Sequence, residues 1–493
     1  MWTQQLLEKT IKDRMGDCLL VVVSQRQPYR HELKKGKPVC QREPGGLVTA
    51  LNPVMQTAHG LWIASASTEY DRLAVDETGK VALPPQDPSY ALRRIFLSKE
   101  ELQAYYYGFC NEGLWPLCHV AYTRPVFRQA DWEAYQQVNR KFADTILEEV
   151  GDRPAFVWIQ DFHLCLVPKY LREAGKTNII TSMFWHIPWP NPEVFRICPQ
   201  KHEILEGFLS CDLVGFHIKY HCDNFLATVD RELECRIDHE NTSVFYQGRE
   251  TLVRPFPVSV DFQDISKKAS SAENAERVKR LREELNIGDR KLFLGVDRID
   301  YTKGIPERLR AIDRFLEKNP EAKGKVVFLQ LGQISRIHIQ RYKNLNDEIN
   351  ALVEEINWKH SDGTWKPVEL TRSYMDYEDI LALYTTADIC IVSSLHDGMN
   401  LVAKEYVACR TDESGCLLLS RFTGASRELG DALQINPFDT ESFADEIARA
   451  FHMPREEQER RMRRMREGVS HQNIYRWVGK VLSQLLRFEF QEA

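Results

Sequence analysis

The stretch that decides the fold is His396-Asp397-Gly398-Met399-Asn400-Leu401-Val402-Ala403-Lys404-Glu405-Tyr406. It follows a mostly apolar run over residues 387–394, which predicts a buried strand of a parallel sheet. Residues 401–410 have helical propensity, so the order is a strand, a short glycine loop and a helix. Loop N–H groups and the positive end of the helix dipole both attract an anion at such a position. The sequence therefore predicts an α/β fold with an anion site here, and a diphosphate suits that geometry.

Glu405 lies one turn inside this predicted helix. The residues three and four positions to either side of it are apolar or Cys, so the helix itself supplies no basic partner. A carboxylate in such surroundings needs a polar partner from elsewhere, and a vicinal diol such as a ribose would serve. From the residues alone an alternative is equally good: Asp397 is a turn residue and Glu405 forms an ion pair within the domain.

The bulk composition indicates an ordinary soluble chain of 493 residues, 43% apolar and with a formal net charge of −6. A pI near 6.2 gives no support for nucleic acid or an anionic membrane as the main partner. The twelve cysteines include no Cys-x-x-Cys pair, which favours reduced packing residues over a disulfide or zinc framework. Residues 1–17 read as an amphipathic helix rather than a signal peptide, and no apolar run reaches membrane-spanning length, so we expect the protein in the cytoplasm.

Residues 397–406 resemble the nucleotide-sugar-binding motif of trehalose-6-phosphate synthases and of the related glucosylglycerol-phosphate synthases. The resemblance implies that Asp397 and the backbone after it hold the donor glucose, that the following amides hold the diphosphate, and that Glu405 binds the ribose hydroxyls. The donor-binding residues implied in this motif are Asp397, Gly398, Met399, Asn400, Leu401, Val402 and Glu405.

The first apolar run, residues 18–24, predicts a central strand that ends near Arg26 and is followed by the paired glycines Gly45 and Gly46. Paired glycines by themselves indicate only a turn. The segment resembles the opening of the same family, which implies that Arg26 binds the phosphate of the acceptor sugar and that Gly45 and Gly46 close over the donor. Trp62 matches the first Trp of another family segment, but Ser65 stands where a second Trp is common. This departure removes an aromatic surface near the acceptor pocket and keeps a different acceptor open.

Tyr106 and Trp115 belong to an aromatic cluster over residues 105–115. Such a cluster by itself indicates core packing, because Tyr and Trp usually bury their rings and satisfy one polar atom. Both residues stand at the spacing of the family. The resemblance implies that their OH and N–H groups bind the acceptor phosphate.

Asp161 and His186 each follow a predicted buried strand, residues 156–160 and 179–184. The carboxyl ends of parallel strands are where such sheets bind their ligands, although a lone His after a strand is more often structural. The resemblance implies that Asp161 binds acceptor hydroxyls and that His186 contacts the donor glucose.

Arg298 and Lys303 come at the end of another predicted strand and before a helix. Two cations at a helix N-terminus form a diphosphate clamp, but pairing of Arg298 with Asp297 or Asp300 is equally good from spacing alone. The resemblance makes Arg298 and Lys303 the candidates for stabilising the leaving group. Arg336 follows the next strand, where trehalose-6-phosphate synthases carry an Arg that helps bind the phosphate of the acceptor.

The resemblance implies the GT-B fold: two facing Rossmann-like domains, with the active site in the cleft and a C-terminal helix that crosses back. Apolar strands with ligand-type residues at their ends fit this α/β class independently. A proline-rich segment around residues 254–260 marks the expected boundary. We expect an N-terminal acceptor-binding domain over residues 1–258, a nucleotide-sugar-binding domain over residues 259–475, and a C-terminal helix over residues 476–493 that packs on the N-terminal domain.

The implied reaction transfers glucose, with retention, from a nucleoside-diphosphate glucose to glucose 6-phosphate and gives α,α-trehalose 6-phosphate. The sequence has no Asp-x-Asp triplet, so we expect no metal and no cofactor, and protein groups must neutralise the departing diphosphate. The candidates for direct roles at the reacting centre are Arg298, Lys303, Asp161 and His186.

Three alternatives stay open. Glucosylglycerol-phosphate synthase would use the same donor site with a smaller acceptor, and the combination of Arg26, Tyr106, Trp115 and Arg336 speaks against it. A pseudo-glycosyltransferase that joins cyclitol units is kept open by Ser65. The third is a non-catalytic sensor of the sugar phosphate. The donor base, the oligomeric state, including a homo-oligomer, and any allosteric regulation are not given by the sequence.

Overall fold

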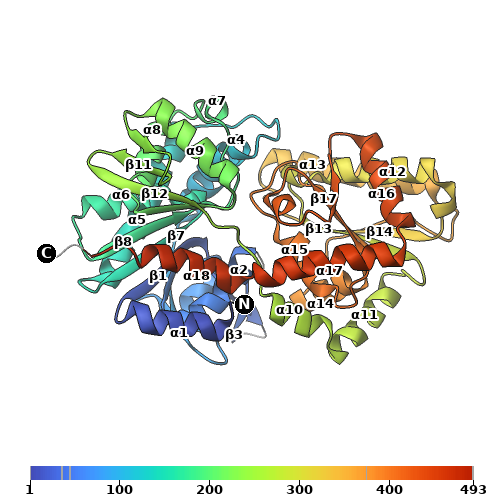
Figure 1. Cartoon of the computed structure of the whole chain (residues 1–493), viewed down its shortest axis with the longest axis horizontal. Coiled ribbons are helices and arrows are strands. Elements are labelled where there is room, and N and C mark those ends of the chain that lie inside the picture. Colours follow the sequence, from blue (N-terminus) through green and yellow to red (C-terminus); the bar gives the residue numbers. More distant parts are fainter. Residues whose placement is uncertain (1, 35–36, 44–45, 374, 491–493) are drawn as a thin grey trace. The chain divides into compact units, whose positions relative to one another are not determined.

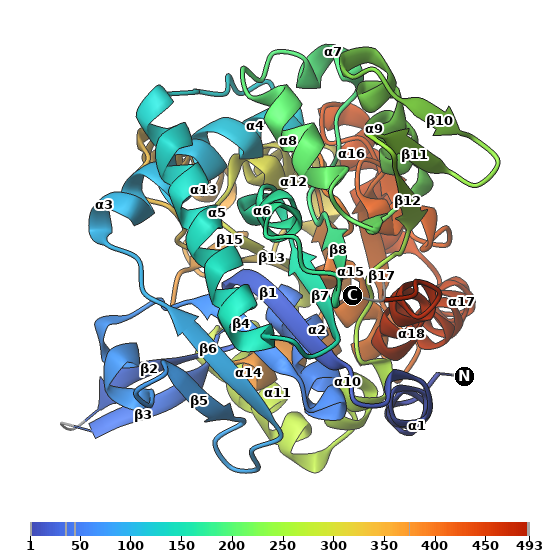
Figure 2. The same ribbon diagram turned by 90° about the vertical axis from the view of Figure 1, so that its left-hand side faces the viewer.

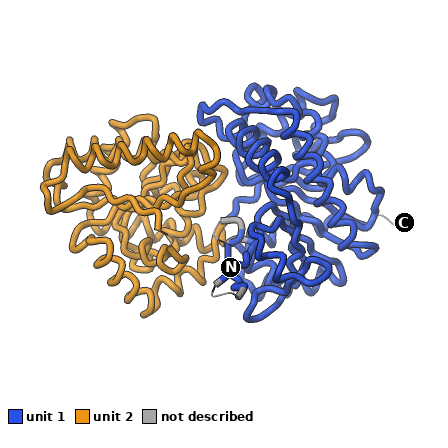
Figure 3. The backbone as a smooth tube through the Cα atoms, turned by 180° about the vertical axis from the view of Figure 1, so that it is seen from behind, with its two compact units in different colours: residues 1–258, 474–493 blue, residues 259–473 orange. Residues whose placement is uncertain are grey.

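The structure is a computed structural model that describes residues 2–34, 37–43, 46–373 and 375–490. The chain divides into two compact units (Figure 3). Unit 1 comprises Met1–Val258 together with Ile474–Ala493, and unit 2 comprises Ser259–Asn473. No helix in the described ranges is long and apolar enough to cross a bilayer.

Unit 1 is built on one large sheet of ten described strands, in the order β10-β11-β12-β9-β8-β7-β1-β4-β6-β5. The strands from β12 to β6 run parallel, and the strands at both edges are antiparallel. Their bounds are β1 (Leu19–Arg26), β4 (Leu61–Ser65), β5 (Lys80–Leu83), β6 (Tyr90–Ile95), β7 (Ala155–Gln160), β8 (Ile179–Phe184), β9 (Leu213–Phe216), β10 (Arg236–Asp238), β11 (Ser243–Tyr246) and β12 (Arg249–Pro255).

The central strands of unit 1 show why these residues form a parallel sheet. Every residue of β4, β7, β8 and β9 is buried, as expected for strands that are covered on both faces and therefore carry continuous apolar runs. Later strands of the chain lie on opposite sides of β1, with β4 and β6 on one side and β7, β8 and β9 on the other. The strand order therefore reverses between β1 and β7, and such a switch point is where open α/β sheets bind ligands.

The remaining elements of unit 1 are helices around this sheet and one small hairpin, β2 (Tyr29–Lys34) with β3 (Lys37–Arg42) (Figure 2). The helices are α1 (Gln4–Met15), α2 (Gly46–Ala58), α3 (Lys99–Glu101), α4 (Trp115–His119), α5 (Gln129–Val150), α6 (Val167–Glu173), α7 (Pro192–Phe195), α8 (Lys201–Phe208), α9 (Lys219–Glu232) and α18 (Ile474–Leu485), with the 3₁₀ turns η1 (Glu69–Ala74) and η3 (Phe162–Leu164) and the π-helix η2 (Leu102–Leu114).

The C-terminal helix α18 belongs to unit 1, although the helix before it belongs to unit 2. Its Trp477 packs against Trp158 of β7, with ring centroids 4.9 Å apart, and against Phe184 of β8 at 5.2 Å. Its Gly479 allows close approach of Trp2, since a Cβ there would lie 2.5 Å from the indole. Helices α1 and α18 lie side by side (Figure 2). The predicted return of a C-terminal helix is confirmed.

Unit 2 contains a six-stranded sheet in its described part, entirely parallel, in the order β15-β14-β13-β16-β17-β18. The order again reverses, here between β13 and β16, as in dinucleotide-binding folds. The strands are β13 (Lys291–Arg298), β14 (Val326–Gln333), β15 (Val368–Thr371), β16 (Ile389–Val392), β17 (Cys416–Ser420) and β18 (Leu433–Ile435).

Helices cover this second sheet on both faces (Figure 1). One layer holds α12 (Ile305–Lys318), α13 (Gln340–His360) and α16 (Thr440–His452), and the other holds α10 (Phe262–Ala269), α11 (Ala272–Glu284), α14 (Tyr377–Thr386), α15 (Leu401–Cys409) and α17 (Arg455–His471). The short turns are η4 (Tyr301–Lys303), η5 (Pro320–Ala322) and η6 (Gly424–Arg427). The predicted α/β class with two Rossmann-like sheets is confirmed.

Candidate active site

Four of the predicted site residues end or follow strands that flank the two switch points. In unit 1, Arg26 ends β1 and Asp161 directly follows β7, which pairs with β1 in parallel. In unit 2, Arg298 ends β13 and Asp397 follows β16, which also pairs with β13. Because the carboxyl ends of neighbouring parallel strands meet at one edge of a sheet, each fold gathers these residues where it is built to bind a ligand.

Asp161 has a backbone conformation that an L-residue rarely adopts, with φ 72° and ψ 172°. This region is almost restricted to glycine and costs free energy, so its presence at a strand end points to function. The conformation is held by the hydrogen bond from Asp161 N–H to the carbonyl of Phe184, at 2.7 Å. Oδ1 of Asp161 accepts a hydrogen bond from the backbone N–H of His186, at 3.2 Å. The structure thus brings together two residues that the sequence places at separate strand ends.

The loop after Asp161 is fixed by α5. The Tyr135 hydroxyl donates to the Phe162 carbonyl and accepts from the Cys165 N–H, both at 2.9 Å. Asn139 donates to the His163 carbonyl at 3.1 Å. Sequence reasoning missed these supports, because nothing local to α5 indicates that its side chains reach a loop more than twenty residues away in the chain.

His186 is a largely buried and neutral imidazole. Burial lowers its pKa to about 3, so it carries no charge at neutral pH. Its Nε2 lies 2.9 Å from Oε1 of Gln160, the last residue of β7. Gln160 is fully buried, and sequence reasoning passed over it in favour of its neighbour Asp161.

Tyr106 and Trp115 lie on and directly after η2, a π-helix. Such wide turns are rare and often occur at functional sites. The Tyr106 ring stacks on the His163 ring, with centroids 5.6 Å apart and an interplanar angle of 11°. The Trp115 ring is buried against His119 and Phe162. Tyr106 and Trp115 therefore flank the loop that follows Asp161, and their phosphate-binding role stays a prediction.

Arg26 is exposed at the end of β1. Hydrogen bonds of Ser24 fix this end of the strand. The Ser24 hydroxyl donates to the Arg26 carbonyl at 2.6 Å and accepts from the Trp62 indole N–H at 2.8 Å. Trp62 is fully buried, so it is a supporting core residue. Gly46 is the first residue of α2, and Gly45 lies outside the described residues.

In unit 2, two motifs that are far apart in the sequence meet in an ion pair. Nζ of Lys303 lies 2.7 Å from Oδ2 of Asp397. The same oxygen accepts from the Asn400 side chain at 3.2 Å and from the Ser394 hydroxyl at 3.3 Å. The contact sets the predicted diphosphate clamp beside the predicted sugar-binding loop.

The carboxylates near Arg298 each have another arginine partner. Asp297 pairs with the buried Arg308 at 2.7 Å, and Asp300 pairs with Arg336 at 3.1 Å. Burial by itself would raise the pKa of Asp300, but the charge of Arg336, followed by that of Arg298, holds it below its usual value. The charge of Arg298 therefore acts on Asp300 together with that of Arg336.

Arg336 has an unusual conformation and an internal contact that the sequence did not indicate. Its φ is 52°, and its side chain is only 5% exposed. Besides Asp300, its guanidinium donates to the Tyr342 hydroxyl at 2.7 Å. The predicted role at the phosphate of the acceptor must therefore coexist with a structural role within unit 2.

Helix α15 presents its first turn at the switch point. Its N-cap Asn400, with φ 84°, accepts from the Ala403 N–H at 3.1 Å. Leu401 and Val402 begin the helix and remain partly exposed, and N–H groups of a first turn have no partner within the helix. At the other end, Arg466 donates to the carbonyl of Ala408 at 2.7 Å and to that of its neighbour. The helix is fixed at both ends, with its positive end toward the predicted anion site.

The carboxylate of Glu405 is largely buried in this helix. The Tyr384 hydroxyl donates to it at 3.3 Å, and Tyr384 is another residue that the sequence did not single out. The adjacent Lys404 is fully buried and pairs with Glu428; burial lowers the pKa of Lys404 despite that partner.

Comparison with known proteins decides the family. Residues 19–487 match the model of glycosyltransferase family 20. The chain belongs to this family. It is 37% identical to the trehalose-6-phosphate synthase of Mycolicibacterium vanbaalenii over an alignment of 480 residues, which covers 96% of each chain.

Two solved structures extend the comparison of this family 20 chain to the fold. One is the E. coli trehalose-6-phosphate protein bound with UDP-2-fluoro glucose, at a TM-score of 0.85 and 28% identity, covering 96% of this chain and 100% of that one. The other is a UDP-forming α,α-trehalose-phosphate synthase of Burkholderia xenovorans in complex with glucose-6-phosphate. Its TM-score is 0.84 and its identity 29%, and the match covers 94% of this chain and 99% of that one. The resemblance stated from the sequence is confirmed, and so is the fold class.

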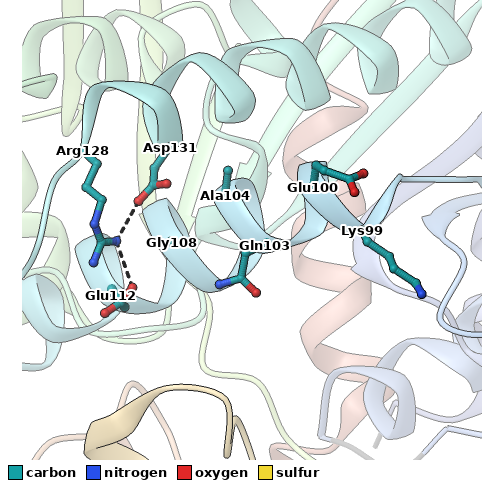
Figure 4. Close-up of a pocket in the computed structure, with 8 residues that line it drawn as sticks. All are labelled: Lys99, Glu100, Gln103, Ala104, Gly108, Glu112, Arg128 and Asp131. Carbon is teal, nitrogen blue, oxygen red and sulfur yellow. Dashed lines mark hydrogen bonds and ion pairs between the residues drawn. The ribbon is translucent and has the colours of Figure 1, made fainter.

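A cavity of about 650 Å³ contains none of the predicted family 20 site residues. It is lined by Lys99 and Glu100 of α3, four residues of η2 and the pair Arg128 and Asp131. Arg128 bridges Glu112 and Asp131, at 2.9 and 3.0 Å (Figure 4), so its charge is already balanced. Among the described residues, no group of three His, Cys, Asp or Glu side chains could hold a metal ion.

Proposed function

We propose that this chain is an α,α-trehalose-6-phosphate synthase that transfers glucose from UDP-glucose to glucose 6-phosphate with retention of configuration. The observation that carries the proposal is the meeting of Lys303 with Asp397 at the switch point of unit 2. It joins the two donor motifs of the family in one place. The nearly full-length similarity to synthases of this name supports the same reaction.

The donor is assigned to unit 2. The diphosphate would lie against Arg298, Lys303 and the first turn of α15, with Glu405 on the ribose hydroxyls. An ammonium has three donor hydrogens, so Lys303 can keep Asp397 and still reach a phosphate oxygen. Each preorganised donor of this kind contributes roughly 3 kcal/mol toward the transition state. These groups supply the neutralisation that the departing diphosphate needs.

The acceptor is assigned mainly to unit 1. Arg26, Tyr106 and Trp115 would bind its phosphate and Asp161 its hydroxyls, and Arg336 is a further candidate for that phosphate. Asp161 is anchored by the His186 N–H, which suits a residue that orients a sugar. We infer a same-face reaction in which the C1 hydroxyl of the acceptor attacks the anomeric carbon while the bond to the diphosphate breaks, and the leaving phosphate takes the proton.

The donor base and the cellular compartment are further parts of the proposal. Uridine is favoured because the B. xenovorans relative is UDP-forming and the E. coli structure holds a UDP-sugar analogue. None of the twelve cysteines, all within the described residues, is assigned to a disulfide, which supports the reducing environment of the cytoplasm.

The test is a matrix of turnover measurements. UDP-, GDP- and ADP-glucose are each combined with glucose 6-phosphate and with glycerol 3-phosphate, with and without EDTA, and the anomeric configuration of the product is read by NMR. We expect turnover with UDP-glucose and glucose 6-phosphate that survives EDTA and gives the α,α product. A preference for glycerol 3-phosphate would replace the proposal by glucosylglycerol-phosphate synthase, and absence of turnover throughout would indicate a sensor.

A further inference from the structure

The side-chain amide of Gln160 has only one orientation that suits its surroundings. Its Nε2 donates to the carbonyl of Trp158 at 3.4 Å, and its Oε1 faces Nε2 of His186 at 2.9 Å. In the flipped orientation the amide oxygen of Gln160 would face the carbonyl oxygen of Trp158, and neither atom can donate a hydrogen bond. The oxygen of Gln160 therefore faces the imidazole, and an amide oxygen only accepts hydrogen bonds.

The surroundings of His186 keep its ring neutral. The ring lies against Phe184, with centroids 4.6 Å apart, and near Trp477 of α18 at 6.4 Å. The titratable groups facing it are Asp161, whose carboxylate is bound to the His186 N–H, and His217, whose Nε2 contacts the His186 carbonyl at 3.1 Å. Desolvation holds the pKa of His186 far below neutrality. A neutral imidazole has one N–H and one lone pair.

We propose that Gln160 is a positioning residue that holds His186 as the Nε2–H tautomer, so that Nδ1 presents a lone pair to a hydroxyl of the bound sugar. Since Oε1 of Gln160 can only accept, Nε2 must carry the proton. Nδ1 makes no hydrogen bond to any residue that the structure describes, and His186 keeps some exposure. The identity of the ligand as a sugar hydroxyl rests on the proposed function, whereas the tautomer does not.

This arrangement has a consequence for specificity. An imidazole lone pair accepts a hydrogen bond from a hydroxyl but offers nothing to a hydrogen atom or a fluorine at the same carbon. Sites built to hydrogen-bond a hydroxyl reject analogues that lack it strongly. The opposite tautomer would turn the site into a donor and remove this selection.

The test reads the tautomer directly in the ligand-free protein. Histidines are labelled with ¹⁵N, and long-range ¹H–¹⁵N correlation spectra report which ring nitrogen carries the proton; the signals of His186 are identified by their loss in His186→Gln. We expect the Nε2–H pattern from about pH 6 to pH 8, where an ordinary His would titrate. An Nδ1–H pattern in the unaltered protein would overturn the proposal without any variant being made.

Two substitutions separate positioning from packing. Gln160→Met keeps the volume and removes the acceptor, so we expect a mixture of tautomers and a kcat about 10-fold lower with the KM for glucose 6-phosphate unchanged. Gln160→Glu supplies a charged acceptor that raises the pKa of His186, and we expect imidazolium signals and an acid-side change in the pH profile of kcat. Gln434→Met, at another strand glutamine bound to a backbone carbonyl, is expected to leave the imidazole spectrum unchanged. An unchanged spectrum in Gln160→Met would contradict the role of Gln160, whether or not the protein proves to be a synthase.

Discussion

Unit 1 and unit 2 share one topology but use it with different electrostatics. Both sheets reverse their strand order at one point, between β1 and β7 and between β13 and β16, and both carry some of the predicted site residues there. In unit 1 that place holds Arg26 and the strained Asp161, whose carboxylate accepts from the backbone N–H of the neutral His186. In unit 2 it holds the cations Arg298 and Lys303, and Lys303 is compensated by Asp397. Topology thus determines where a ligand binds, and the local charge balance determines which ligand it is.

The charge balance of unit 2 includes two buried ion pairs beside Arg298. Asp297 and Asp300 each have an arginine partner within hydrogen-bonding distance. Arg308 and Arg336 thus compensate the two carboxylates that flank Arg298 in the sequence. Predictions that alter one unit while the other stays intact test this division.

The largest expected effect comes from Lys303→Ala. It removes the ammonium beside Asp397 and leaves that carboxylate to repel a diphosphate, so we expect kcat to fall about 100- to 1000-fold. The KM for glucose 6-phosphate should change little. Lys303→Arg keeps the charge and serves as the control, with a smaller loss. Release of UDP measured under saturating donor is the readout, and a loss below about 10-fold would contradict the role of Lys303 at the leaving group.

Arg336→Ala tests a residue of unit 2 that is predicted to serve the acceptor. It leaves the buried Asp300 without its arginine, which costs about 3 kcal/mol of unfolding free energy, and it should also raise the KM for glucose 6-phosphate. Chemical denaturation and steady-state kinetics measure the two effects.

The double variant Arg336→Ala with Asp300→Asn separates these effects. It removes the stranded charge, so most of the stability should return while the KM for glucose 6-phosphate stays high. Recovery of both would show that Arg336 acts only through the fold, and equal weakening of donor and acceptor would contradict a specific contact to the phosphate of the acceptor.

Gly424→Ala tests whether the sugar-binding loop of unit 2 is held by close packing. A Cβ at Gly424 would lie 2.1 Å from the carbonyl oxygen of Gly398, and the two segments are joined by hydrogen bonds between Gly424 and Asp397 at 3.1 Å and between Ala425 and Met399 at 2.8 Å. The loop must shift, and we expect kcat/KM for the donor to fall about 10- to 100-fold.

Gly430→Ala is the matched control, because a Cβ there meets nothing within 4 Å. It should leave the kinetics unchanged. A Gly424→Ala variant with the donor kinetics of Gly430→Ala would show that the loop does not depend on this contact.

The smallest expected effect is a difference in stability between two variants of Asp161 in unit 1. Its backbone suits glycine, so Asp161→Gly should be more stable than Asp161→Ala by about 1–2 kcal/mol, since only alanine retains the strain. Both variants should lose the acceptor contact and have similarly low activity. Thermal or denaturant unfolding provides the comparison, and equal stabilities would mean that the strained conformation is not retained without the carboxylate.

The sequence predicts those features that are local. Apolar runs identify the central strands, and residues in the loops that follow them, such as Asp161 and Asp397, fall at the carboxyl edge of the sheet whatever the tertiary detail. The sequence does not predict which residues from distant parts of the chain form ion pairs. Spacing offered Asp297 and Asp300 as partners of Arg298, but it gave no sign that Arg308 and Arg336 pair with those carboxylates, because tertiary approach brings together residues that are distant in the sequence.

Supporting residues escaped prediction for the same reason. Gln160 and Tyr384 contact His186 and Glu405 from other elements, and a buried glutamine or tyrosine carries no signal that distinguishes this role from packing. The π-helix η2 was likewise missed, because its wide turn depends on packing and not on a residue pattern. Residues adjacent to a motif and residues on the neighbouring strand are the places to look for such supports.

The most direct measurement is calorimetric titration of two variants, Lys303→Ala and Arg26→Ala. Each variant is titrated with UDP and then, in the presence of saturating UDP, with glucose 6-phosphate. We expect the affinity for UDP to fall in Lys303→Ala alone and the affinity for glucose 6-phosphate to fall at least about 10-fold in Arg26→Ala. Such a crossed pattern would assign the diphosphate to the switch point of unit 2 and the acceptor phosphate to that of unit 1. Equal weakening of UDP by both variants would contradict this assignment.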